Sequence, residues 1–341
     1  MNVHRVSMVA GIVSYGLYLP SRLVTAKEAS KSSGIPLDVI TGKQGWKKKR
    51  ISERSEMPTE MAVKAALRAL QKSRSEAGIG PDDIDAVLYV GSEFKDYGIW
   101  MAATKIQYDL GISRGFAFDV TAMCVGMVLG LALAKRMKGM AENILLVAAS
   151  KESYLVNEKD KETTWLLNFA DGASATIVSN KYDKNLILES SFISDGRFYG
   201  AVVVKDFGAI RLTEEGYSAR PRFESIIGKD FLKRELGPRS REAFNKVIRE
   251  AVELSGYSVR DIDLLVVNHM KRSFHSKLIE DLGINPERAP YLEEFGHTQS
   301  SDMIIGLDLG LKKGLVSDGS IIVFASGGTG FLWGATVLRW G

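Results

Sequence analysis

The sequence predicts an α/β protein built from two similar halves. Three kinds of segment occur in the same order in the first and second parts of the 341-residue chain. They are apolar runs typical of strands buried on both faces, helical stretches between those strands, and a glycine-led strand that closes each half. This repeated alternation of strands and helices favours two α/β layers packed as a pseudo-dimer.

The first repeated pair consists of residues 83–90 and 261–268. Each begins with Asp-Ile-Asp and continues as an apolar run. An amphipathic helix precedes each run, and we expect Thr59 to cap the first helix and Ser240 to cap the second. Both hydroxyls can accept a hydrogen bond from a free backbone N–H at a helix start.

The remaining pairs set the predicted boundary between the halves. The matching strands are 143–150 with 320–326 and 172–178 with 334–338, and the corresponding helices are 125–140 and 303–313. The halves then meet near residues 182–186, which gives domains 1–182 and 183–341. Residues 194–237 have no counterpart in the first half, and we expect surface hairpins or a lid over a pocket there.

The composition excludes several classes of protein. The chain is 45% hydrophobic and 25% charged, as is ordinary for a soluble globular protein. Its single cysteine excludes an internal disulfide and a multi-cysteine metal site, so we expect no metal and a cytoplasmic location. The start of the chain lacks the apolar core of a signal peptide. The longest apolar stretch, residues 120–134, is shorter than the roughly 20 residues of a membrane span. A net charge of +4 without a broad basic face argues against nucleic acid.

Cys124 is the candidate nucleophile. A predicted strand ends near Val120, and the long apolar helix begins just after the cysteine. A thiol at a helix N-terminus meets the positive end of the helix dipole, which favours the reactive thiolate. Ala122 and Gly126 beside it leave room for a substrate chain. A buried structural cysteine remains the alternative, since free cysteine is among the most buried residue types.

Two of the four histidines occupy positions that suit catalysis. His269 ends a repeated strand, at the carboxyl edge where α/β sheets place ligands, and His297 lies in a glycine-marked loop before a helix. A cysteine in one half and two histidines in the other suit nucleophilic catalysis, although a lone histidine at a strand end is usually structural. We expect His4, near the terminus, and His275, on a helix surface, to be incidental.

The glycine-rich stretch 326–330 is a candidate for backbone catalysis. It lacks the spacing and the lysine of a phosphate-binding loop, and a strand follows it where a helix would be required. We interpret it as a tight turn that brings backbone N–H groups to a reaction centre.

Four motifs together resemble β-ketoacyl-acyl-carrier-protein synthase III and its relatives in the thiolase superfamily. They are an Ala-x-Cys-x-Gly segment, an Asp-Gly-Ala strand entry, a C-terminal Gly-Phe-x-Trp-Gly-Ala and an N-terminal Gly-x-x-x-x-Arg-Ile, at residues 118–126, 168–175, 330–335 and 45–51. The resemblance covers essentially the whole chain. It implies the thiolase fold, with the two halves in a five-layered α-β-α-β-α arrangement.

The resemblance also implies roles for the candidate residues. Cys124 would attack an acyl thioester, and the N–H of Cys124 with one from Gly328 or Thr329 would hold the oxyanion. His269 would stabilise the enolate formed when a malonyl thioester loses CO2, and a Claisen condensation would follow. No cofactor is expected, because acyl-CoA or acyl-carrier-protein thioesters are substrates.

Several departures from the family pattern leave alternatives open. The family's catalytic asparagine is replaced by His297, which could support decarboxylation or act as a base for another acceptor. The tryptophan that usually stacks on the CoA adenine is missing, with Val39 near its place. A thioester of some kind is therefore a safer donor than CoA itself.

Glu93 suggests a second chemistry. The segment 89–93 resembles hydroxymethylglutaryl-CoA synthases, in which this glutamate is the acid/base, and Glu93 precedes Cys124 by 31 residues. A buried carboxylate with a raised pKa could deprotonate an acetyl thioester without decarboxylation. The alternative is a solvated strand end or a salt bridge to a nearby lysine.

The expected partners are thioester carriers and a second copy of the chain. We expect substrate or carrier contacts from the following residues: Lys43, Trp46, Lys47, Lys271 and Arg272. The basic run 47–50 is a landing site for an acidic carrier or, alternatively, a solvated loop. The resemblance implies a homodimer in which the strand near 144–149 pairs across the two-fold axis and residues 97–100 reach the partner's acyl pocket.

Three functions follow. The first is a decarboxylating ketoacyl synthase of fatty-acid or secondary metabolism. The second is a non-decarboxylating condensation or acyl transfer to another acceptor, with Glu93 or His297 as base. The third is a catalytically silent partner of a related second subunit, against which the retention of Cys124 and His269 argues.

Overall fold

The computed structural model describes residues 9–159, 166–205 and 222–341. The elements of the first half are β1 (Gly11–Tyr18), β2 (Leu23–Thr25), α1 (Ala26–Ser33), β3 (Lys48–Arg50), α2 (Pro58–Ala77), β4 (Ala86–Tyr89), α3 (Ala102–Asp109), β5 (Phe116–Asp119), α4 (Gly126–Arg136), β6 (Asn143–Ser150) and β7 (Gly172–Ser179). Those of the second are β8 (Leu186–Ser194), α5 (Lys229–Leu254), β9 (Ile262–Val267), α6 (Arg272–Leu282), α7 (Asp302–Lys312), β10 (Ile321–Gly328) and β11 (Leu332–Arg339).

The main strands join in the order β5-β4-β6-β7-β1-β8-β11-β10-β9. Strand β1 pairs with β7 along its length but meets β8 only where Gly11 faces Leu186. The sheet therefore divides into two parts at this point, one from each half of the chain. The predicted boundary at residue 182 lies in the connection between β7 and β8.

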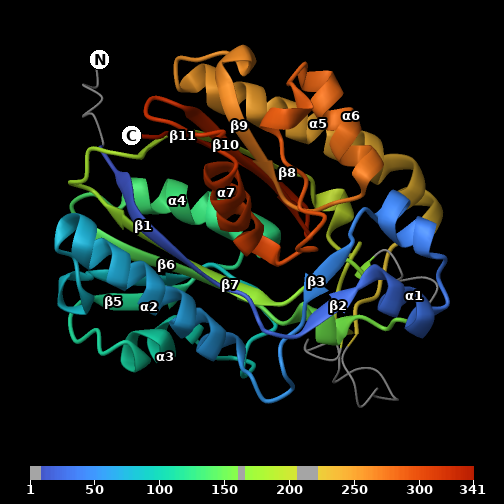
Figure 1. Ribbon diagram of the computed structural model, residues 1–341, viewed down its shortest axis with the longest axis horizontal. Helices are drawn as coiled ribbons and strands as arrows, with labels where there is room; N and C mark the ends of the chain where they lie inside the picture. Colours follow the sequence, from blue (N-terminus) through green and yellow to red (C-terminus); the bar gives the residue numbers. More distant parts are fainter. Residues whose placement is uncertain (1–8, 160–165, 206–221) are drawn as a thin grey trace.

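The helices form the other layers. Helices α2 and α3 cover the outer face of the first part of the sheet, α5 and α6 cover the outer face of the second, and α4 and α7 lie between the two parts (Figure 1). The central apolar cluster takes residues from both parts of the sheet, such as Leu146 and Phe324, together with both central helices. This confirms the predicted five-layered α-β-α-β-α arrangement.

The two predicted helix caps are wrong. Helix α2 begins one residue before Thr59, at Pro58, whose fixed φ suits the first helical position, and the Thr59 hydroxyl donates to Asp96 instead. Helix α5 begins at Lys229 and continues through Pro238, so Ser240 lies inside it. Part of the predicted lid, residues 194–237, is therefore helical, and its residues 206–221 lie outside the described part of the chain.

The expectation that the strand near residues 144–149 pairs across a two-fold axis is wrong. This strand is β6, and β4 and β7 already occupy both of its edges. The strands at the two ends of the sheet are β5 and β9. Within the described residues, no helix has both the length and the apolar character needed to cross a membrane.

The packing of α2 on β1 leads to a stability prediction. A Cβ added at Gly16 would lie 2.1 Å from the Ala65 carbonyl oxygen and 2.7 Å from the Ala69 nitrogen, both backbone atoms of α2. Because the backbone of α2 could make room only by disturbing its packing on β1, Gly16→Ala should lower the free energy of unfolding by about 1–3 kcal/mol. Chemical denaturation measures this loss. Gly42→Ala is the matched control, because no atom lies within 4 Å of its added Cβ; equal effects of both changes would contradict the account.

Candidate active site

Cys124 lies at the start of the central helix α4. The chain leaves β5 at Asp119, passes through a short 3-10 turn over Met123–Val125 and enters α4. The Asp119 carboxylate accepts the N–H groups of Ala102 and Ala103 and pairs with Lys95, which fixes the entry to this turn. The cysteine is a free thiol and is buried.

The sulfur contacts a histidine from the other half of the chain. Cys124 Sγ lies 3.1 Å from His297 Nε2, and His297 Nδ1 lies 2.6 Å from Asp302 Oδ2. The structure thus brings two of the predicted residues together and adds Asp302, which the sequence analysis missed. A cysteine, a histidine and an orienting carboxylate in series form the arrangement of an activated nucleophile.

Asp302 is the first residue of α7 and is fully buried. Besides His297, its carboxylate accepts the main-chain N–H of Thr298 at 2.7 Å and that of His269 at 2.8 Å. Burial alone would lower the pKa of His297. The charges of Asp302 and Cys124 and the hydrogen bonds to both outweigh burial and hold the pKa well above its usual range.

His269 differs from His297 in its protonation state. Burial lowers the pKa of His269 to about 4, although the charge of Asp302 and a backbone contact with Gly45 raise it. Its Nδ1 lies 3.0 Å from the amide nitrogen of Asn168. Its Nε2 is buried without a hydrogen-bond partner among the described residues. Leaving such a group unpaired costs about 1–3 kcal/mol, and a substrate oxygen or a water molecule can supply the missing partner.

The glycine-rich stretch forms the end of β10 and its turn into β11. The Ser326 hydroxyl donates to the Cys124 carbonyl at 2.7 Å. A Cβ added at Gly328 would lie 3.1 Å from the Cys124 nitrogen, so a side chain there would crowd the space beside this N–H. The stretch therefore packs against the backbone of the nucleophile. The oxyanion role of Cys124, Gly328 and Thr329 stays a prediction.

Glu93 makes no recorded hydrogen bond or ion pair with Cys124, His297 or His269. It is exposed, accepts the Thr121 hydroxyl at 2.6 Å and lies 3.7 Å from Lys95. Its contacts correspond to the predicted alternative, a salt bridge to a nearby lysine. Besides Asp302, a second buried carboxylate, that of Glu152, interacts with the charge of His297 and accepts hydrogen bonds from Ser92 and Gln299. Burial raises the pKa of Glu152, and these hydrogen bonds oppose the rise.

The remaining histidines are not part of the contact chain. His275 was expected on a helix surface, but it is buried, with its ring 5.0 Å from that of Tyr291. It turns inward because α6 packs this face against the second half. His4 lies outside the described residues. Nowhere in the described ranges do three His, Cys, Asp or Glu side chains gather as they would around a metal ion.

The predicted basic landing site is largely neutralised. Lys47 and Arg272 both pair with Glu293, and Lys48 pairs with Glu294. Burial lowers the pKa of Lys271, and the charge of Lys43 adds to this effect.

Two residues of the same region are buried. Trp46 is fully buried, with its Nε1 donating to Gln44. Lys49 is buried as well, which excludes it from a surface landing site. Its Nζ donates to the carbonyls of Leu167 and Phe169, and burial lowers its pKa to about 8.

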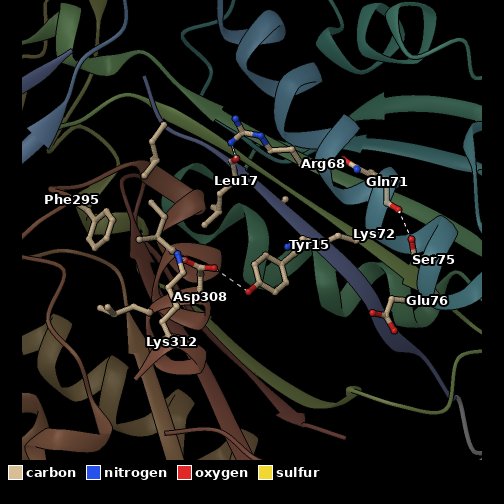
Figure 2. Close-up of a pocket in the computed structure, with 14 residues that line it drawn as sticks. Tyr15, Leu17, Arg68, Gln71, Lys72, Ser75, Glu76, Phe295, Asp308 and Lys312 are labelled. Carbon is tan, nitrogen blue, oxygen red and sulfur yellow. Dashed lines mark hydrogen bonds and ion pairs between the residues drawn. The ribbon is translucent and has the colours of Figure 1, made fainter. Parts of the chain in front are cut away.

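A separate cavity of about 640 Å³ lies beside β1, between α2 and α7. Figure 2 shows Tyr15 hydrogen-bonded to Asp308 of α7 in this cavity, and Lys72 of α2 lies beside it with Nζ 4.4 Å from the centre of the Tyr15 ring. Cys124, His269 and His297 do not line it. The cavity is therefore distinct from the candidate active site.

Two sequence profiles of one family match the chain. The profile of 3-oxoacyl-[acyl-carrier-protein (ACP)] synthase III matches residues 118–196, and that of the C-terminal part of the same enzyme matches residues 252–340. The first range contains Cys124, and the second contains His269 and His297.

Whole-chain comparisons agree with the profiles. A beta-ketoacyl-[acyl-carrier-protein] synthase III from Caldanaerobacter subterraneus is 28% identical over 336 residues, which cover 98% of each chain. One from Cereibacter sphaeroides is 29% identical over 333 residues, covering 95% of this chain and 97% of the relative. The crystal structure of 3-oxoacyl-[acyl-carrier-protein] synthase III from Aquifex aeolicus matches with a TM-score of 0.83 and 26% identity, covering 97% of this chain and all of that one. With the fold and the cysteine–histidine site already described, these matches place the chain in the thiolase superfamily as a condensing enzyme of the β-ketoacyl-acyl-carrier-protein synthase III type.

Proposed function

We propose that this enzyme transfers an acyl group from a thioester to an acceptor through an acyl-Cys124 intermediate. The series of contacts from Cys124 Sγ to His297 (3.1 Å) and from His297 to Asp302 (2.6 Å) carries the proposal. A protonated His297 donates one N–H to the sulfur and the other to Asp302. The sulfur is then a thiolate, which is the nucleophilic form of cysteine.

The acylation step follows from this arrangement. The thiolate attacks the thioester carbonyl, and backbone N–H groups of Cys124 and of Gly328 or Thr329 hold the resulting oxyanion. The bond from the carbonyl carbon to the donor sulfur then breaks. His297 gives its Nε2 proton to the leaving thiol, and it ends the step neutral, with its Nδ1 proton still on the side of Asp302.

A malonyl thioester is the first candidate acceptor. The relatives described above are named beta-ketoacyl-[acyl-carrier-protein] synthase III. The neutral His269, with an unpartnered Nε2, can donate to the enolate oxygen that forms as the malonyl group loses CO2. The carbanion attacks the acyl carbonyl, and the bond to Cys124 Sγ breaks to restore the thiolate. No further cofactor is needed, and either CoA or a carrier protein can present the thioesters.

A hydroxyl or amine acceptor is the second candidate, and the Asp302 contact favours it. With its Nδ1 proton held by Asp302, a neutral His297 presents a lone pair at Nε2. Such a group takes a proton from an acceptor, whereas the asparagine of the family pattern donates one hydrogen bond. Glu93 is the weaker base because it is exposed and engaged with Thr121. The intact contact series argues against a catalytically silent subunit.

We further propose a homodimer in the cytoplasm, formed through β5. This strand lies at the end of the sheet, where one of its edges pairs with no other strand of the described residues and can pair with a second copy. The nearby side chains of Tyr97, Ile99 and Met101 are exposed apolar groups that a partner could cover. Lys43 and Lys271 are candidates for contact with an anionic carrier or a CoA phosphate.

The covalent step is tested by removing the sulfur. Wild-type protein incubated with a series of acyl-CoA and acyl-carrier-protein thioesters should gain the mass of the acyl group, and Cys124→Ala should gain none. Intact-protein mass spectrometry measures the adduct. Thermal unfolding of the variant should match wild type within a few degrees, because the change removes a single buried atom. An adduct on Cys124→Ala would contradict the proposal.

The acceptor is tested at His297. In His297→Asn the amide can still donate, so CO2 release from a malonyl thioester should stay within about tenfold of wild type if that thioester is the acceptor. If His297 serves as a base, acyl transfer should fall by about 10²–10⁴-fold. CO2 release is measured as radiolabelled CO2 from a labelled malonyl thioester, and acyl transfer is measured by chromatography of the product. His275→Asn is the matched control, since this buried histidine lies outside the contact series. Acyl transfer within about tenfold of wild type in His297→Asn would exclude the base role of His297, and a loss of CO2 release of more than about 10²-fold would contradict the malonyl acceptor.

A further inference from the structure

One buried residue, Asn168, contacts both histidines of the site. Its side-chain amide nitrogen lies 3.0 Å from His269 Nδ1, and its main-chain oxygen accepts the main-chain N–H of His297 at 2.7 Å. We propose that Asn168 is a positioning residue that holds His269 neutral with its proton on Nε2, so that His269 donates while His297 alone moves protons. The catalytic part of this inference rests on the acyl-transfer function proposed above.

The assignment follows from the hydrogen-bonding capacity of the groups. An amide nitrogen only donates, so His269 Nδ1 must accept from Asn168 and the ring proton must lie on Nε2. This Nε2 is buried and has no partner among the described residues. Its N–H is therefore available to a substrate oxygen, with the nearby Gly45 backbone as the competing protein group.

The two histidines differ in what faces Nδ1. For His297 it is the Asp302 carboxylate, which favours a second ring proton, and for His269 it is the uncharged amide of Asn168. Asp302 meets His269 only at its main-chain N–H, 2.8 Å away. The other titratable groups around His269 are His297, His275 and Tyr291. The guanidinium carbon of Arg272 lies 4.5 Å from the centre of the Tyr291 ring.

Asn168 is itself held firmly. The carbonyls on either side of it, those of Leu167 and Phe169, both accept from the buried Lys49. The next N–H, that of Ala170, donates to the His297 carbonyl at 2.8 Å. A side-chain substitution at Asn168 therefore leaves the main-chain contacts with His297 in place.

The test compares Asn168→Asp and Asn168→Leu with wild type and with Asn157→Asp. The control adds the same charge on a side chain whose recorded contact is with Lys159. Nitrogen-15 NMR of the labelled imidazoles reports the His269 tautomer in the substrate-free protein. Rates of acyl-enzyme formation and of its turnover are then measured from about pH 5 to pH 9.

We expect wild type and Asn157→Asp to carry the His269 proton on Nε2 across this pH range. The turnover rate should then show no change with pH that comes from titration of His269. In Asn168→Asp, a carboxylate at Nδ1 should move the proton there and raise the pKa of His269. Turnover should then fall about 100-fold as pH rises through that new value, while acyl-enzyme formation stays within about threefold. In Asn168→Leu, His269 should populate both tautomers. The turnover rate should fall, but without a new dependence on pH.

Two results would overturn the inference. One is a His269 proton on Nδ1 in wild type; the other is an unchanged tautomer and pH profile in Asn168→Asp. Equal losses of acyl-enzyme formation and turnover in both variants, with lowered melting temperatures, would assign Asn168 a structural role instead. Failure of wild type to form any acyl-enzyme would refute the proposed function, and the tautomer would still decide the inference.

Discussion

The site depends on the buried carboxylate of Asp302. A buried charge is costly unless it is paired and hydrogen-bonded. This one accepts the imidazole N–H of His297 and the main-chain N–H groups of Thr298 and His269. It also lies at the positive end of α7. Because α7 is packed between the two parts of the sheet, the position of this carboxylate, and with it of both histidines, is fixed by the core.

The nucleophile reaches this cluster only because the two halves pack together. Cys124 comes from the turn between β5 and α4, and its partner His297 from the loop before α7. Both helices lie in the central layer (Figure 1). The Ser326 hydroxyl ties the Cys124 carbonyl to β10, so the first half is held to the second beside the reacting sulfur. Packing of the central layer thus sets the catalytic distances.

Much of the fold could be predicted from the sequence because it repeats itself. The apolar runs at 143–150 and 262–267 are strands since their residues are buried on both faces. Cys124 and His297 could be selected from their positions at element ends. Asp302 could not, since an aspartate at a helix start is ordinarily a solvated cap. Asn168 and Glu152 were missed because only tertiary packing reveals their partners, His269 and Gln299.

The central claim is that Asp302 and Cys124 keep His297 protonated. Nitrogen-15 NMR of the imidazole groups tests it directly when wild type is titrated beside Asp302→Asn. The account predicts that both nitrogens of His297 in wild type still carry protons at pH values well above the ordinary histidine pKa, because the pKa of His297 is held well above its usual range. Asp302→Asn should lose the second proton at a clearly lower pH. A wild-type His297 that titrates near the ordinary value, about 6.5, would contradict the account.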